Sequence, residues 1–173
     1  DTSERLWTIL MNGCSGHLIA PELMMSAGHC QLLPNETFTS GFALNKGERD
    51  DISLVSVVEK DDKLDYQIVK IKWTSGYPPA QNFPPLIATK PSDVSVDAAA
   101  GKGDVLFTVG FPGDKINTWG ATYDEGSAKG VDGTDLLFNV SIINGNSGGG
   151  VWRLKDHMLV SLTNGGIHNL GEE

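Results

Sequence analysis

Apolar and polar residues alternate in short stretches along most of this chain, with turn residues between them. In the first half these stretches have the length of β-strands and lie at residues 6–11, 14–20, 23–26, 37–44, 52–58 and 66–71. The last one, Tyr66-Gln67-Ile68-Val69-Lys70-Ile71, alternates polar with apolar side chains, which is typical of a strand with one buried face. The charged run 59–63 is predicted to be a loop.

The second half repeats this pattern after a proline-rich interruption. Pro78-Pro79 and Pro84-Pro85 would break a strand ladder, so we expect a linker at 78–92 between an N-terminal unit, 1–77, and a C-terminal unit, 93–173. Strand candidates of the C-terminal unit are 104–109, 117–123, 136–140, 150–154 and 158–163. Because helical periodicity is nearly absent and turns are frequent, the chain is predicted to be an all-β protein built of barrels.

Composition narrows the class of protein. With 39% hydrophobic and 20% charged residues, the 173-residue chain resembles an ordinary globular protein. No stretch has the apolar length needed to cross a bilayer. The net charge is −9 and lysine and arginine form no cluster, which argues against nucleic acid and against a membrane surface as partners.

The two cysteines, Cys14 and Cys30, either form one disulfide or remain two thiols. We favour the disulfide, which implies an oxidising compartment and hence a secreted protein. No leader segment begins the chain, so we expect that a signal segment has been removed. Two cysteines do not make a structural zinc site by themselves, and the sequence predicts no metal and no cofactor.

Three short motifs carry residues for nucleophilic catalysis. Gly145-Asn146-Ser147-Gly148-Gly149 presents a serine among uncrowded backbone amides, Ser26-Ala27-Gly28-His29-Cys30 presents a histidine, and Asp65 begins the strand stretch at 66–71. A serine becomes a nucleophile when a neighbouring base takes its proton, and an aspartate orients that base. We therefore predict Ser147 as nucleophile, His29 as general acid and base, Asp65 as its orienting partner, and the N–H groups of Gly145 and Ser147 as an oxyanion hole.

Each of these residues also has a plainer interpretation. Ser147 could be a turn serine, His29 a buried structural histidine, and Asp65 a solvated carboxylate. Asp65 differs from Asp61 and Asp62 because it opens an apolar strand instead of lying inside a charge run. The order histidine, aspartate, serine, found with all three motifs present, favours catalysis.

These motifs carry a family resemblance. The stretch from Cys14-Ser15-Gly16 to His29-Cys30 resembles the histidine region of the chymotrypsin/trypsin-like serine proteases, including its cysteine spacing. Residues 107–115, followed by 145–149, resemble the bacterial branch that includes the glutamyl endopeptidases. The resemblance implies two antiparallel six-stranded β-barrels with the active site in the cleft between them, and a monomeric endopeptidase that hydrolyses polypeptides through an acyl-enzyme. A propeptide or a protein inhibitor would be further partners.

The specificity pocket departs from both better-known branches. Ser141 stands where trypsin-like enzymes have an acidic pocket floor, and Ile142 follows it. The stretch 161–166 lacks the histidine that glutamyl endopeptidases place there. We therefore expect a substrate site that favours a small or medium apolar side chain before the cleaved bond, with 162–165 pairing along the substrate backbone. Its predicted residues are Ser141, Ile142, Leu162, Thr163, Asn164 and Gly165.

A second hypothesis comes from a different class of protein. Asn146 replaces the aspartate that animal enzymes use for activation, and the chain ends soon after Gly165-Gly166, where the family continues. Asn146 indicates that this activation switch is absent, and the missing C-terminal portion would suit a catalytically inactive or zymogen-like binding module that keeps the protease fold. The presence of His29, Asp65 and Ser147 together favours the enzyme.

Overall fold

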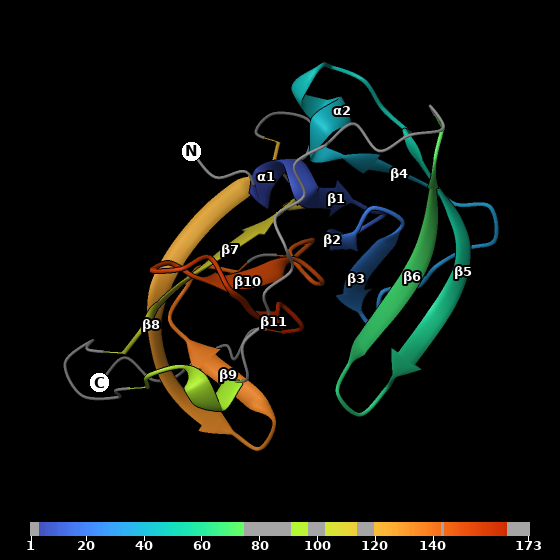
Figure 1. Cartoon of the computed structure of the whole chain (residues 1–173). Helices are drawn as coiled ribbons and strands as arrows, with labels where there is room; N and C mark the ends of the chain where they lie inside the picture. The colour runs from blue at the N-terminus through green and yellow to red at the C-terminus, as the bar shows by residue number, and fades with distance from the viewer. Residues whose placement is uncertain (1–3, 75–90, 97–102, 114–119, 143, 166–173) are drawn as a thin grey trace.

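A closed β-barrel forms the first half of the molecule. The computed structural model describes residues 4–74, 91–96, 103–113, 120–142 and 144–165 of the chain. Six antiparallel strands follow one another in the order β1-β2-β3-β6-β5-β4, and β4 pairs with β1 to close the barrel (Figure 1). The elements of this unit are α1 (Glu4–Trp7), β1 (Thr8–Leu10), β2 (Ser15–Ala20), β3 (Leu23–Ala27), β4 (Thr37–Ser40), α2 (Gly41–Asn45), β5 (Ile52–Asp61) and β6 (Tyr66–Trp73).

The barrel core follows from the period of two in its strands. In β6, Val69, Ile71 and Trp73 are buried, while Lys70 and Lys72 between them are exposed. Side chains alternate across a strand, so this pattern turns one face of β6 into the barrel and the other into solvent. The barrel core is completed by Ile9, Met24, Phe38 and Ile52.

The second unit is a curled antiparallel sheet with strand order β11-β10-β7-β8-β9. Its described part contains five strands, where the family resemblance predicts a six-stranded barrel. Strands of the closed barrel all lie within 1–77 and strands of this sheet all lie within 93–173. Its elements are η1 (Pro91–Asp93), β7 (Val105–Gly110), β8 (Thr122–Asp132), β9 (Asp135–Phe138), β10 (Gly150–Arg153) and β11 (Leu159–Leu162).

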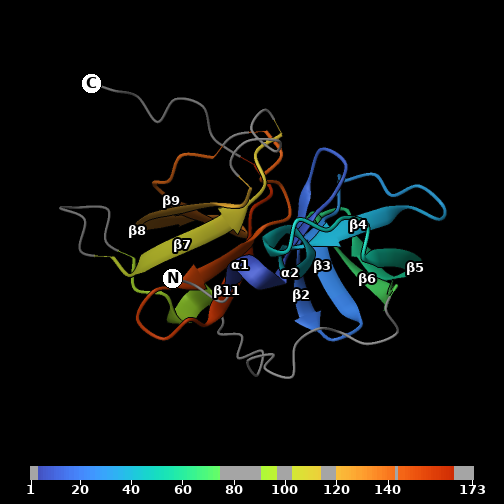
Figure 2. The same ribbon diagram turned by 90° about the horizontal axis from the view of Figure 1, so that it is seen from above.

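The two units lie side by side and share an apolar contact (Figure 2). Leu106 of β7 packs into the sheet's own core with Val151. The next residue, Phe107, faces the opposite way and packs with Trp152 in a cluster that reaches Ile19 of β2. Because successive residues of β7 serve two different cores, the same strand holds the sheet together and joins it to the barrel.

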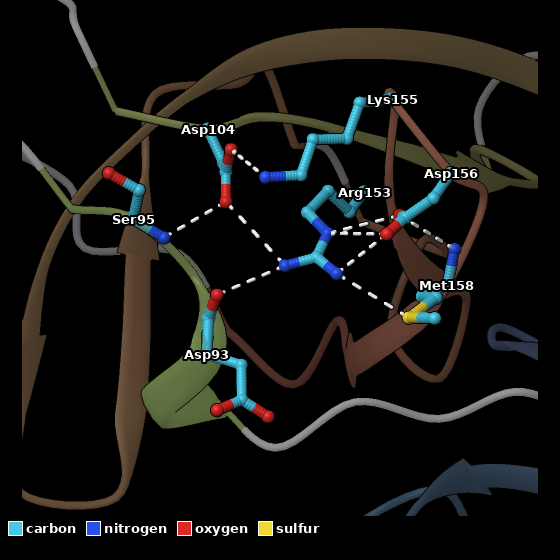
Figure 3. A network of polar contacts seen from close by, with 7 residues as sticks. All are labelled: Asp93, Ser95, Asp104, Arg153, Lys155, Asp156 and Met158. Atoms are coloured by element: carbon cyan, nitrogen blue, oxygen red, sulfur yellow. Dashed lines mark hydrogen bonds and ion pairs between the residues drawn. The ribbon is translucent and has the colours of Figure 1, made fainter.

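A buried arginine anchors the beginning of the second unit (Figure 3). The Arg153 guanidinium donates to the Asp156 carboxylate at 2.6 Å and to the backbone oxygen of Asp93 at 3.0 Å. It also lies 3.7 Å from Asp104, which accepts the Ser95 N–H at 2.9 Å. The hydrogen bond from Arg153 lowers the pKa of Asp156 below its usual value. This network ties η1 to the neighbouring ends of β7 and β10.

Several predicted elements of the barrel differ from the observed ones. The predicted strand 37–44 ends at Ser40, whose hydroxyl accepts the Ala43 N–H at 3.1 Å and caps α2. The predicted strand 6–11 begins as the short helix α1 and becomes extended only at Thr8. The predicted loop 59–63 is wrong at its start, because β5 continues to Asp61, which pairs with Tyr66.

In the second unit, the predicted strand 117–123 is misplaced. The observed β8 begins at Thr122 and continues to Asp132, and residues 117–119 lie outside the described part of the chain. The predicted linker 78–92 also lies outside the described residues, apart from its last two positions in η1. Across the described part of the chain, we find no helix long and apolar enough to cross a membrane.

Candidate active site

His29 and Asp65 meet because β3 pairs with β6. The pairing places Ala27 opposite Tyr66, so the residues just beyond these positions lie next to each other. One oxygen of the Asp65 carboxylate lies 2.8 Å from His29 Nδ1, and the other accepts the His29 backbone N–H at 2.8 Å. A carboxylate accepts hydrogen bonds, so Nδ1 carries the proton in this contact and Nε2 is left as the basic nitrogen of the neutral ring.

The side chain of Gln67 holds the backbone on both sides of His29. This buried side chain donates to the carbonyl oxygens of Ala27 and Cys30 at 2.8 and 2.7 Å. The two carbonyls flank His29 in the chain, so one amide group fixes both ends of the segment that carries the imidazole. The ring itself is about half exposed, with 48% of its side-chain surface accessible, which leaves its outer face open to a substrate.

The predicted disulfide between Cys14 and Cys30 is confirmed. A ring nitrogen of His29 lies within 4.8 Å of the disulfide sulfurs, and the carbonyl oxygen of Ser147 lies 3.9 Å from the Cys30 sulfur. The bridge therefore brings the segment carrying His29 next to the loop carrying Ser147. The described residues contain one cluster of potential metal ligands, formed by Cys14, His29 and Cys30. Its two sulfurs are not free thiolates because they are bonded to each other.

Every backbone carbonyl from residue 144 to residue 150 accepts a hydrogen bond from the protein. Four of these bonds come from other backbone N–H groups: Gly113 donates to Asn144 at 2.7 Å, Gly149 to Asn146 at 2.9 Å, Ser15 to Ser147 at 2.7 Å, and Thr163 to Gly149 at 2.8 Å. The other three come from the side chains of Ser15, His17 and Thr108, which bind the carbonyls of Gly145, Gly148 and Gly150 at 2.8, 3.0 and 3.0 Å.

This arrangement determines where the N–H groups of the loop point. A peptide unit is planar and trans, so its N–H points away from its own C=O. The carbonyls of Asn144 and Asn146 are held by the protein, and the N–H groups of Gly145 and Ser147 belong to the same two peptide units. Neither of these N–H groups donates a hydrogen bond to any described residue. Both N–H groups are therefore free of a protein acceptor among the described residues, which is the condition that an oxyanion hole requires.

Gly148 shows how closely the loop approaches the barrel. Its φ is +88°, and a Cβ there would collide with the carbonyl oxygen of Ser15 and the hydroxyl of Ser26. Its N–H donates to Thr163 at 2.5 Å. A residue with any side chain would push the loop off the barrel, so the position requires glycine.

His17 supports the same loop from β2. Its Nδ1 lies 3.0 Å from the carbonyl oxygen of Gly148, its ring contacts Trp152 edge-on, and its buried Nε2 has no hydrogen-bond partner among the residues that the structure describes. Burial lowers the pKa of His17 to about 4, and the bond to Gly148 opposes this only in part. The residue is therefore neutral at physiological pH and acts as a donor to the loop.

A cavity of about 580 Å³ opens between the two units. Five of the six predicted substrate-binding residues line it: Ile142, Leu162, Thr163, Asn164 and Gly165. Ser141 does not line the cavity; it is exposed, and its N–H donates to Asp124 at 2.6 Å. Most of the remaining lining is apolar and comes from Met25, Leu64 and Tyr66 of the barrel and from the β8–β9 hairpin with Val131, Leu136 and Phe138.

Ser15, His17, Leu64 and the β8–β9 hairpin carry no motif in the sequence that predicts a functional role. A buried serine or histidine looks like an ordinary strand residue until the strands are placed. The sequence holds only a weak indication that Val131 and Leu64 line a cavity: each is an apolar residue within a polar turn region. In the structure they are 56% and 43% exposed.

The comparisons with known proteins define the class of fold. No family model matches the sequence, and no curated protein matches it. Among the solved structures that match are the Rv3671c protease in its inactive form and a Glu endopeptidase in complex with MPD, each with a TM-score of 0.66 and 16% identity. Each match covers 95% of this chain, together with 80% of the first structure and 81% of the second. The chain therefore has the chymotrypsin-like fold, and the predicted fold class is confirmed.

Proposed function

We propose that this protein is a serine endopeptidase. Ser147 is the nucleophile, His29 the general acid and base, and Asp65 the residue that orients the imidazole. The N–H groups of Gly145 and Ser147 stabilise the oxyanion. The observation that carries the proposal is the fully hydrogen-bonded set of loop carbonyls, which leaves both of these N–H groups without a protein acceptor among the described residues.

The chemistry uses one proton relay twice. His29 Nε2 accepts the Ser147 Oγ proton as the oxygen attacks the substrate carbonyl and forms a C–O bond. The negative charge on the carbonyl oxygen is held by the two N–H groups. His29 then gives its proton to the leaving amine as the C–N bond breaks. Water, deprotonated by His29, hydrolyses the acyl-enzyme, and the proton returns to Ser147.

The substrate is an unfolded polypeptide with apolar side chains near the cleaved bond. In the described part of the sheet, β11 lies at an edge and pairs with β10 alone, so a peptide can be added along it as a further strand. The cavity beside this edge is lined mainly by aliphatic and aromatic side chains, which favours a small or medium apolar residue. We further propose that the enzyme is monomeric and secreted, in keeping with its disulfide.

An activity-based probe tests the proposal. A fluorophosphonate should form an O–P bond with Ser147 Oγ, lose fluoride and pass the serine proton to His29. We expect one adduct by intact mass on the oxidised wild-type protein and none on Ser147→Ala. Ser56→Ala, which removes an exposed hydroxyl from the outside of the barrel, should be labelled like the wild type. An unlabelled, folded wild type would favour the inactive binding module instead.

A further inference from the structure

We propose that Ser15, a residue of the first barrel, positions the oxyanion hole of the second unit. The inference rests on the proposed function and extends it to a residue outside the three catalytic motifs. Ser15 is fully buried at the start of β2, directly after Cys14. It is a positioning residue, because it acts on the loop that holds the oxyanion and does not touch the substrate.

All polar groups of Ser15 take part in holding this region. Its hydroxyl donates to the carbonyl of Gly145 at 2.8 Å and accepts the N–H of Phe111 at 2.8 Å. Its backbone N–H donates to the carbonyl of Ser147 at 2.7 Å, and its own carbonyl accepts the hydroxyl of Ser26 at 2.8 Å. The side chain thus adds two contacts that a glycine or alanine at this position would lack.

These two contacts join two loops of the second unit. Phe111 follows β7, and Gly113 two residues later donates to the carbonyl of Asn144. The Ser15 hydroxyl fixes the peptide unit 145–146, while the bond from Gly113 fixes the peptide unit 144–145 that carries the Gly145 N–H. The Ser15 hydroxyl therefore connects the loop that carries Gly145 to the segment after β7 that carries Phe111.

Gly145 needs such a restraint because it is glycine. Its φ is +101°, and a Cβ there would collide with the backbone of Phe111 and Gly113. The absence of a side chain permits this close approach, but it also allows the flanking peptide units to rotate easily. A peptide rotated at this point would turn the Gly145 N–H away from the substrate oxygen. The hydroxyl of Ser15 opposes that rotation from a rigid strand.

The test compares Ser15→Ala with Ser40→Ala. Ser40 is equally buried, and its hydroxyl also makes one donated and one accepted hydrogen bond, to Asp51 and from Ala43. It lies in the first barrel, and its side-chain partners, Asp51 and Ala43, belong to that barrel and not to the loop 144–150. Each variant therefore loses one donated and one accepted hydrogen bond from the first barrel, so a general loss of stability would appear in both.

The first measurement is inactivation by the fluorophosphonate probe, resolved into kinact and KI. Loss of one oxyanion donor costs about 10²- to 10³-fold in rate, and we expect its misplacement in Ser15→Ala to lower kinact by about 10-fold or more. KI should stay within about twofold, because the oxyanion contacts act in the transition state. Ser40→Ala should match the wild type in both constants. Equal kinact values for the two variants would overturn the proposal.

The second measurement does not depend on catalysis. The amide signals of Gly145 and Ser147 in ¹⁵N-labelled protein should shift or broaden in Ser15→Ala and stay unchanged in Ser40→Ala. If the wild type is not labelled by the probe, the proposed function fails, and these signals still decide the role of Ser15. Unchanged amide signals in Ser15→Ala would overturn it, whatever the activity.

Discussion

Acid should destabilise this protein through His17, and the size of the effect follows from its burial. Burial holds the pKa of His17 at about 4 in the folded protein, against 6.5 for an ordinary histidine. Between these two values the unfolded chain binds a proton that the folded protein does not. The part of the unfolding free energy that depends on neutral His17 is therefore fully present above pH 6.5 and falls as the pH drops from 6.5 toward 4. Below pH 4 the folded protein also binds the proton, so His17 causes no further loss.

The magnitude can be worked out from the same pair of values. Each pH unit in this window costs about 1.4 kcal/mol of unfolding free energy. At pH 5 the loss due to His17 is therefore about 2 kcal/mol relative to pH 8, and at pH 4 it approaches about 3 kcal/mol. Carboxylates elsewhere titrate over part of the same range, so the contribution of His17 must be measured as a difference.

The variant His17→Gln provides that difference. A glutamine amide can donate to the carbonyl of Gly148 but does not titrate. Urea unfolding followed by tryptophan fluorescence at pH 8 and pH 5 gives the change in stability for each protein. We expect the wild type to lose about 2 kcal/mol more than His17→Gln over this interval. An equal loss in both proteins would refute the assignment of a buried, neutral His17.

Other consequences of the structure can be tested with single changes. Gly148→Ala should lower the unfolding free energy by more than about 2 kcal/mol, measured by urea unfolding, because its Cβ would meet the carbonyl of Ser15; a native-like stability would contradict the observed loop geometry. Replacing Cys14 and Cys30 by alanine should cost about 3 kcal/mol by the same assay, and an unchanged midpoint would argue against a stabilising bridge. Asp65→Asn should leave the thermal midpoint nearly unchanged while lowering the turnover of an ester substrate about 10³- to 10⁴-fold, and full turnover would remove Asp65 from the mechanism.

The sequence predicts the architecture well where local pattern and tertiary structure agree. Strand β6 alternates in the sequence as it does in the barrel, and the cysteine pair forms the expected bridge. The motifs of His29 and Asp65 are brought together by the pairing of β3 with β6. Roles assigned to individual site residues stay predictions until activity is measured.

Other elements depend on interactions that the sequence alone does not display. Strand β8 contains Gly126, Gly130 and several charged residues, a composition that disfavours strands, and it is held in place by pairing with β7 on one side and β9 on the other. The helix α2 begins because the hydroxyl of Ser40 caps it, although the preceding residues continue the pattern of a strand. Some of the hydrogen bonds that hold the loop 144–150 join residues more than a hundred positions apart, such as Ser15 and Gly145.

Cleavage of peptide bonds tests the central claim most directly. A library of unfolded peptides of known sequence would be incubated with the oxidised wild-type protein and with Ser147→Ala, and the products sequenced by mass spectrometry. We predict internal cleavage after small or medium apolar residues by the wild type and none by Ser147→Ala. No cleavage by the wild type, or the same cleavage by both proteins, would contradict the proposal that this protein is a serine endopeptidase.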